Sequence, residues 1–186
     1  MAAQKKLEKT NESYSVAKIA GIKMIEAFNR QYKTKYLSLM PCNLFGPNDN
    51  YDSQNSHFLP ALIKKIFAAS KKNKIVKLWG TGKPLRELLY VDEVADACEY
   101  FLRKKTKSSL INIGSPIEMS IKDYAIKIKN KIDPNVLIKF DKNIKLDGVK
   151  RKKLDISLAS RNGWKSKMNF SKAIDKTIED YKNFQR

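Results

Sequence analysis

The apolar positions of this 186-residue chain alternate between helical and strand spacing. From Val16 to Phe28 they recur every three or four residues, which predicts a helix with that face buried. Shorter apolar runs bounded by Gly, Pro or Asn predict strands. The expected helices cover about 10–32, 56–70, 92–103, 120–132, 155–162 and 171–184, the strands 35–40, 75–79, 86–91, 110–113 and 136–140, and the loops 43–50, 80–84 and 141–153.

Alternating helices and short strands indicate an α/β fold with parallel strands. A doubly wound nucleotide-binding sheet also needs a first strand–helix–strand unit with a glycine-rich phosphate turn. This chain contains no G-x-G-x-x-G motif, and Gly80-Thr81-Gly82 is its nearest approach. Pro84 blocks a helix start directly after that turn. The parallel sheet is therefore expected to be incomplete.

Composition adds limits on the class of protein. No run approaches the roughly 18 apolar residues that span a membrane, and the polar residues 1–9 lack the apolar core of a secretory signal. Cys42 and Cys98 have no metal-ligand spacing, so we expect no metal site and a reduced, cytoplasmic protein. Cys98 is predicted to be a small core residue on the buried face of its helix.

The net charge of +19 suggests nucleic-acid binding, because basic surfaces attract phosphate. Of the 38 basic residues, however, 32 are Lys and six are Arg, whereas base recognition favours Arg. The lysines are scattered over every predicted helix, and no nucleic-acid-binding motif is present apart from the basic run 150–153. The charge also suits anionic ligands such as nucleotide sugars, so a basic nucleic-acid-binding domain is kept only as an alternative.

Tyr14 and Lys18 are the most informative pair in the chain. Residues four apart on a helix lie on one face, about 5–6 Å between Cβ atoms. An ammonium so close stabilises the phenolate and lowers the tyrosine pKa from about 10. Such a tyrosine can pass a proton to a substrate oxygen. On spacing alone, a surface helix that happens to carry both residues is the simpler interpretation.

Further motifs favour the functional interpretation. They are Thr10-Asn11-Glu12, Tyr14 to Gly21, Asn29 to Tyr32, Met40 to Pro47, Asn55-Ser56-His57, Pro60-Ala61-Leu62, Trp79 to Gly82, Arg86-Glu87, Val91-Asp92, and Arg151-Lys152 with Leu154-Asp155. In their order and spacing, from about Lys9 onward, the chain resembles the C-terminal part of an extended short-chain dehydrogenase/reductase of the NAD-dependent epimerase/dehydratase type. Within that superfamily it is most similar to the GDP-L-fucose synthases.

The resemblance implies an enzyme that uses NADP(H). The residue matching Tyr14 protonates the reduced C4 oxygen. The residue matching Lys18 holds the nicotinamide ribose and lowers the tyrosine pKa, and His57 matches an acid used in epimerisation. A lone histidine is more often structural than catalytic, so the catalytic role of His57 is inferred from the resemblance alone. The matched cofactor-binding positions are Lys18, Pro41, Cys42, Asn43, Leu44 and His57.

The matched substrate-binding positions are Lys65, Trp79, Arg86 and Asp147. Arg86 can fork onto phosphate, and Trp79 can stack on a flat ring or sugar, although it could also be plain core. Asp147 can accept hydrogen bonds from hydroxyls. Lys64 could serve in place of Lys65. These positions imply a GDP-sugar substrate, with another nucleotide-sugar epimerase or dehydratase of the superfamily as the alternative.

Several family features have no match in this chain. They are the serine or threonine that polarises the carbonyl, the cysteine that acts as epimerisation base, and the glycine-rich turn. We therefore expect the C-terminal part of a Rossmann-type enzyme that converts GDP-4-keto-6-deoxy-D-mannose to GDP-L-fucose with NADPH. Alone it is expected to be inactive. It would then be a split-gene product with a separate N-terminal half, a truncated reading frame or a binding remnant, and a homodimer is expected when the enzyme is complete. The dinucleotide-binding remnant is expected over 1–52 and 84–104, and the substrate domain over 53–83 and 105–186.

Overall fold

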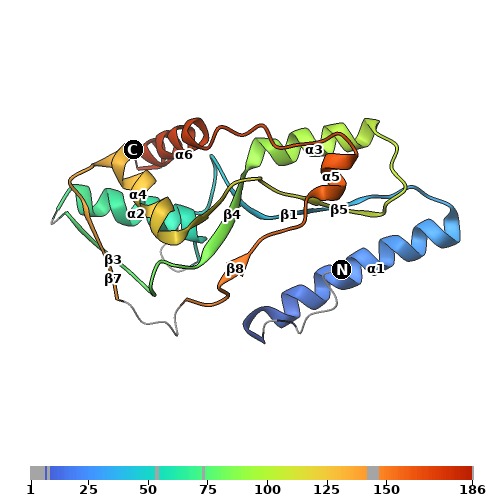
Figure 1. Ribbon diagram of the computed structural model, residues 1–186, viewed down its shortest axis with the longest axis horizontal. Helices are drawn as coiled ribbons and strands as arrows, with labels where there is room; N and C mark the ends of the chain where they lie inside the picture. Colours follow the sequence, from blue (N-terminus) through green and yellow to red (C-terminus); the bar gives the residue numbers. More distant parts are fainter. Residues whose placement is uncertain (1–6, 8, 53–54, 73, 142–146, 186) are drawn as a thin grey trace.

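Figure 1 shows the computed structural model, which describes residues 7, 9–52, 55–72, 74–141 and 147–185. The helices are a short 3-10 helix η2 (Lys9–Asn11), α1 (Glu12–Tyr32), α2 (Phe58–Ser70), α3 (Val91–Arg103), α4 (Ile121–Ile132), α5 (Ser157–Arg161) and α6 (Phe170–Phe184). The strands are β1 (Ser38–Pro41), β2 (Asn43–Phe45), β3 (Ile75–Leu78), β4 (Leu85–Tyr90), β5 (Leu110–Ile113), β6 (Glu118–Ser120), β7 (Leu137–Phe140) and β8 (Arg151–Lys152).

Most strand pairs are parallel, which confirms the expected α/β class. β1 pairs with β5, β2 with β4, β3 with β7 and β8 with β4, all in parallel, while β6 runs antiparallel to β4. β1 and β2 are one chain segment that changes partner at Cys42, whose N–H donates to the Ile113 carbonyl at 2.9 Å. Cys42 thus lies where this segment leaves β5 and joins β4.

Two hydrophobic cores hold the fold together. The first lies among α2, α4, α6 and β3, and its fully buried residues include Ile66, Ile128 and Ile174. The second lies between α3, β5 and α5, where Phe101, Ile113 and Trp164 meet. β4 contributes to both cores, with Leu88 in the first and Leu89 in the second. Alternate side chains of one strand point to opposite faces, so β4 joins the two halves of the chain.

Helix α1 is where the expected burial is wrong. The helix forms as predicted, but it has no buried residue, and Val16, Met24 and Phe28 are exposed. Figure 1 shows it set apart, along the side of β1 and β5 away from α3. The apolar spacing is real, yet no element of the described chain covers this face. Amphipathic spacing predicts a helix that needs a partner and does not show which chain supplies it.

Other differences are local. Pro41 ends β1 as its last residue rather than breaking the strand before it, and 43–45 forms β2 instead of a loop. Cys98 is exposed, because α3 buries a narrow stripe that includes Ala97 and Phe101. The predicted helix over 120–132 is confirmed as α4, and Ser120 forms a capping box with Asp123 at its start. Part of the expected loop over 141–153, and the polar start of the chain, lie outside the described residues.

Candidate functional site

The turn between β3 and β4 presents an aromatic face to solvent. Trp79 follows β3 directly and is 75% exposed, so the alternative that it is plain core is wrong. The Lys65 Nζ, from α2, lies 4.9 Å from the centroid of the Trp79 ring. Gly80 and Gly82 flank Thr81 with φ of +75° and +74°, a left-handed conformation that favours glycine. The turn therefore holds a flat ring beside a cation.

Asp147 closes this turn from a distant segment. Its Oδ1 accepts from the Thr81 N–H at 2.6 Å and its Oδ2 from the Thr81 hydroxyl at 2.7 Å. These two hydrogen bonds, in that order, lower the pKa of the Asp147 carboxyl. A Cβ at Gly80 would collide with the same carboxylate. Asp147 is thus ionised and already engaged, with lone pairs left on each oxygen for a ligand.

Arg86 lies beside Asp147 on β4. Its Nη1 donates to the Leu85 carbonyl at 2.8 Å and to the Val149 carbonyl at 2.7 Å. Burial lowers the pKa of the guanidinium, and the negative charge of Asp147 opposes that shift. Among the described residues no further hydrogen bond of the guanidinium is found, so its other donors can serve an anion. Lys65, Trp79, Arg86 and Asp147 therefore come from four segments and gather around one turn.

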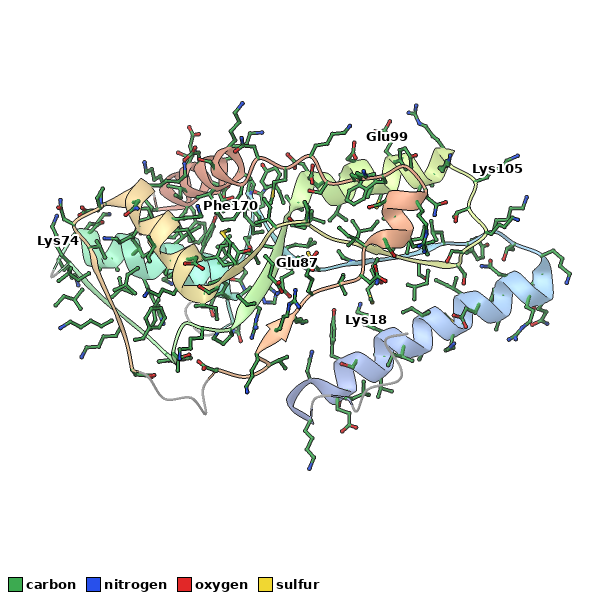
Figure 2. The ribbon with its side chains drawn as sticks, in the orientation of Figure 1. Lys18, Lys74, Glu87, Glu99, Lys105 and Phe170 are labelled. Carbon is green, nitrogen blue, oxygen red and sulfur yellow. The ribbon has the colours of Figure 1, made fainter. Side chains whose placement is uncertain are left out.

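The pair Tyr14 and Lys18 lies apart on α1. The Lys18 Nζ is 5.3 Å from the centroid of the Tyr14 ring, so the two side chains meet as their spacing predicts. The ammonium lies over the ring face, and Tyr14 is 61% exposed. Figure 2 shows Lys18 on α1, the helix that is set apart in Figure 1. Within the described residues no hydrogen bond or ring contact joins this pair to the turn after β3.

The stretch Pro41 to Leu44 runs along the carboxyl end of β1 and into β2, the edge at which ligands of parallel sheets bind. The thiol of Cys42 is half-buried in this stretch. Burial and then the neighbouring charge of Glu87 raise its pKa to about 12. Cys42 is therefore a neutral thiol at physiological pH and not a nucleophile.

His57 stands at the N-cap of α2 and is exposed. Its carbonyl accepts from the Ala61 N–H at 3.0 Å, and its side chain makes no capping hydrogen bond. Asp49 is its acidic neighbour: burial raises the Asp49 pKa, while the Asn50 N–H and the charge of His57 oppose the shift. The His57 side chain is therefore exposed to solvent close to the Asp49 carboxyl.

Sequence reasoning missed three residues of this region: Thr81, Asp49 and Glu87. Thr81 lies in the motif Trp79 to Gly82, where its hydroxyl between two glycines was an available signal. Glu87 lies in the motif Arg86-Glu87, where an acidic residue within an apolar strand was the signal. Asp49 carried no such signal. Among the described residues, two hollows of about 370 and 360 Å³ are lined by none of the predicted site residues. In the same part of the chain no set of three acidic, His or Cys side chains could hold a metal, and no helix combines the length and apolarity for a membrane crossing.

Comparison with known proteins places these observations in context. The NAD dependent epimerase/dehydratase family model matches residues 1–114. The chain is 40% identical to GDP-L-fucose synthase 1 of Arabidopsis thaliana over 94% of its length, and 37% identical to GDP-L-fucose synthase of Escherichia coli over 93%. These matches cover 54% and 57% of the two relatives, so the chain spans about half the length of the curated relatives it matches.

A solved structure gives the same picture of the fold. The GDP-L-fucose synthetase from Naegleria fowleri bound to NADP superimposes with a TM-score of 0.87 at 26% identity, over 96% of this chain and 58% of that one. The fold of the described residues is therefore that of a large part of an extended, Rossmann-type reductase.

Proposed function

Because the chain belongs to the NAD-dependent epimerase/dehydratase family, we propose that it carries the nucleotide-sugar-binding part of an NADP(H)-dependent epimerase-reductase. The proposed reaction converts GDP-4-keto-6-deoxy-D-mannose to GDP-L-fucose. The observation that carries the proposal is the convergence of Lys65, Trp79, Arg86 and Asp147 around the turn after β3. The similarity to GDP-L-fucose synthases of Arabidopsis thaliana and Escherichia coli supports the choice of a GDP-sugar.

Each of the four residues has a distinct task in this proposal. Trp79 offers a flat, solvent-facing ring for stacking, and the Lys65 ammonium beside it adds a cation for a base carbonyl or a phosphate. Arg86 presents its free guanidinium donors to the diphosphate. Asp147 accepts from sugar hydroxyls with the lone pairs that Thr81 leaves unused.

Calorimetry with GDP tests this part on the chain itself. Trp79→Ala and Arg86→Ala are each expected to weaken GDP binding about tenfold, the effect of losing a stacked base or a charged hydrogen bond. Arg103→Ala is the matched control, since Arg103 is exposed and its ion pair among the described residues is with Glu99 on the same helix. The proposal is wrong if the wild-type chain fails to bind GDP, or if UDP and dTDP bind equally well.

The proposed reduction uses Tyr14 and Lys18. NADPH, when bound, supplies a hydride to the sugar carbonyl carbon. Tyr14 then donates its phenolic proton to the oxygen formed there, and the Lys18 ammonium steadies the resulting phenolate. The residues present fit the nicotinamide end, because Lys18 makes no ion pair in the described chain and Pro41 to Leu44 run from the carboxyl end of β1 into β2. His57 is proposed as the acid of the epimerisation steps.

A completed enzyme is needed to test that chemistry. We propose that a segment matching the other half of the relatives' length covers α1, either on the same polypeptide or as a separate N-terminal half, and that the complete enzyme is a homodimer. Co-expression with the part of the E. coli relative that this chain does not match should yield a complex with reductase activity. In that complex Tyr14→Phe should lower kcat by about 10²–10⁴, and Tyr32→Phe on the same helix should not. An unchanged rate in Tyr14→Phe contradicts the assignment.

The division into domains follows from the same proposal. The dinucleotide-binding part comprises 1–52 and 84–104, and the substrate-binding part 53–83 and 105–186. The pairing of β5 with β1 supports adding Leu110–Ile113 to the first part. We propose the reducing cytoplasm as its compartment, because Cys42 and Cys98 are both free thiols.

A further inference from the structure

A buried carboxylate lies between the two groups of candidate residues. Glu87 is 1% exposed, and Figure 2 shows it near the middle of the molecule, where β4 and β8 run together. None of the ion pairs found among the described residues includes it. Glutamates are almost never fully buried unless they are paired, so this residue needs an explanation.

Backbone N–H groups from two other segments take the place of a cation. Glu87 Oε1 accepts from the Ser115 N–H at 2.7 Å, and Oε2 accepts from the Leu154 N–H at 2.9 Å. Ser115 lies just after β5, and Leu154 just after β8. Both oxygens face donors, so only a side chain with two acceptor atoms satisfies this position.

Cys42 lies on the third side of the carboxylate. In the parallel register Asn43 pairs with Leu88, which puts Cys42 opposite Glu87. The raised pKa of the thiol keeps a proton on sulfur next to the carboxylate. Glu87 therefore contacts the stretch proposed to line the cofactor as well as the segment that follows β8.

The segment held at Leu154 is the one that carries the proposed substrate contacts. It begins at Asp147, which clasps Thr81, and continues through Val149, whose carbonyl accepts from Arg86. It then pairs with β4 at Arg151 and Lys152 before reaching Leu154. Glu87 thus anchors this segment at Leu154, and Asp147 binds Thr81 at its other end.

We propose that Glu87 is a positioning residue of the nucleotide-sugar site, which sets Arg86 and Asp147 by anchoring the 147–154 segment against β4. This proposal rests on the function proposed above. It makes Glu87 the link between the cofactor-lining stretch at Cys42 and the substrate turn at Thr81, without contact to either ligand.

The test compares two carboxylates that tie down the same segment. Glu87→Gln keeps the shape but offers an N–H₂ to one of two N–H donors, so one hydrogen bond becomes a repulsion. Glu118→Gln is the control, because Glu118 ties the same segment through Arg151, which is mostly exposed and donates from Nε to Oε1 at 3.0 Å and from Nη2 to Oε2 at 2.8 Å. Glu87→Asp keeps both acceptors but is one methylene shorter, so it should restore part of the loss.

Hydrogen exchange and GDP titration provide independent readouts. In Glu87→Gln the amides of Leu154 and Thr81 should exchange at least about tenfold faster, and GDP affinity should fall about tenfold. In Glu118→Gln both quantities should stay within about twofold of wild type. Quenching of Trp79 fluorescence by GDP should weaken in Glu87→Gln and stay close to the wild-type value in Glu118→Gln.

The outcomes separate this proposal from the proposed function. A Glu87→Gln protein that melts earlier, yet keeps wild-type exchange at Thr81 and wild-type GDP affinity, overturns the positioning role. If the wild-type chain binds no GDP, the proposed function fails, and exchange at Thr81 alone decides the role of Glu87. Should Glu87→Gln not fold, Glu87→Asp carries the same test. In it, amide exchange at Leu154 and Thr81 should be about threefold faster and GDP affinity about threefold lower than in the wild type.

Discussion

Gly114→Ala is a single-methyl change whose effect follows from the geometry around Glu87. Gly114 is buried directly after β5, and its backbone does not require glycine. A Cβ there would collide with Glu87 Oε1 and lie 2.9 Å from Ile156 Cγ2. The carboxylate has no room to move without leaving the Ser115 and Leu154 amides. The substitution at Gly114 therefore breaks the buried hydrogen bonds of Glu87, a residue 27 positions earlier in the sequence.

The size of the effect comes from those two hydrogen bonds. A hydrogen bond to a charged group contributes about 1.5–3 kcal/mol, and overpacking a core costs about 1–3 kcal/mol. Since one displacement relieves the collision and loses the hydrogen bonds together, we expect the free energy of unfolding to fall by about 3 kcal/mol. For a chain of this length that is a drop in Tm of about 6–12 °C.

Urea unfolding followed by circular dichroism measures this change. Gly21→Ala is the control, because nothing lies within 4 Å of a Cβ at Gly21, and alanine suits its helix. In a Glu87→Ala background, Gly114→Ala should cost less than about 1 kcal/mol, since the colliding carboxylate is gone and only the 2.9 Å approach to Ile156 Cγ2 remains. A loss below about 0.5 kcal/mol in the wild-type background would refute the argument.

Three further predictions concern the thiols, pH and α1. At pH 8 iodoacetamide should alkylate exposed Cys98 and spare Cys42, whose pKa is about 12; mass spectrometry showing equal labelling of the folded chain would contradict this. Burial raises the pKa of Cys42 from 9.0, and those of Tyr51 and Tyr124 from 10.0. The unfolded chain therefore releases these protons first, and the unfolding free energy should fall as pH rises from about 9 toward 12, whereas a flat profile in pH-dependent urea melts would argue against it. Phe28→Ser should change the Tm of this chain by less than about 2 °C, because Phe28 is already exposed, yet abolish co-purification with the complementing half; a large loss of Tm would mean that α1 packs within the chain.

Local patterns predicted most of the elements, and they failed where long-range pairing decided the outcome. Asn43 to Phe45 has the composition of a loop, but its pairing with Leu88 to Tyr90 makes it a strand. Cys98 has the spacing of a core residue, yet the buried stripe of α3 is too narrow to include it. In both cases the neighbour that decides the structure lies far away in sequence.

The candidate site also contains one part that follows from local spacing and one part that depends on long-range contacts. Tyr14 and Lys18 are four residues apart, and their meeting follows from helix geometry alone. The clasp between Thr81 and Asp147 spans 66 residues, and the bond from Leu154 to Glu87 spans 67. No local periodicity encodes such contacts. The motif resemblance could indicate Asp147 and Arg86, but it could not reveal that a buried carboxylate ties their segments together.

The two parts of the proposed site also differ in what holds them in place. The nucleotide-sugar residues are fixed by contacts internal to the chain: the clasp on Thr81, the hydrogen bonds of Arg86, and Lys65 over Trp79. Tyr14, the proposed proton donor, stands on α1, where no residue is buried. A general acid works only when its proton is held within hydrogen-bond reach of the substrate oxygen. If the proposed function holds, nucleotide binding and reduction are therefore separable: binding is expected to need only this chain, while proton transfer from Tyr14 is expected to need the segment that covers α1.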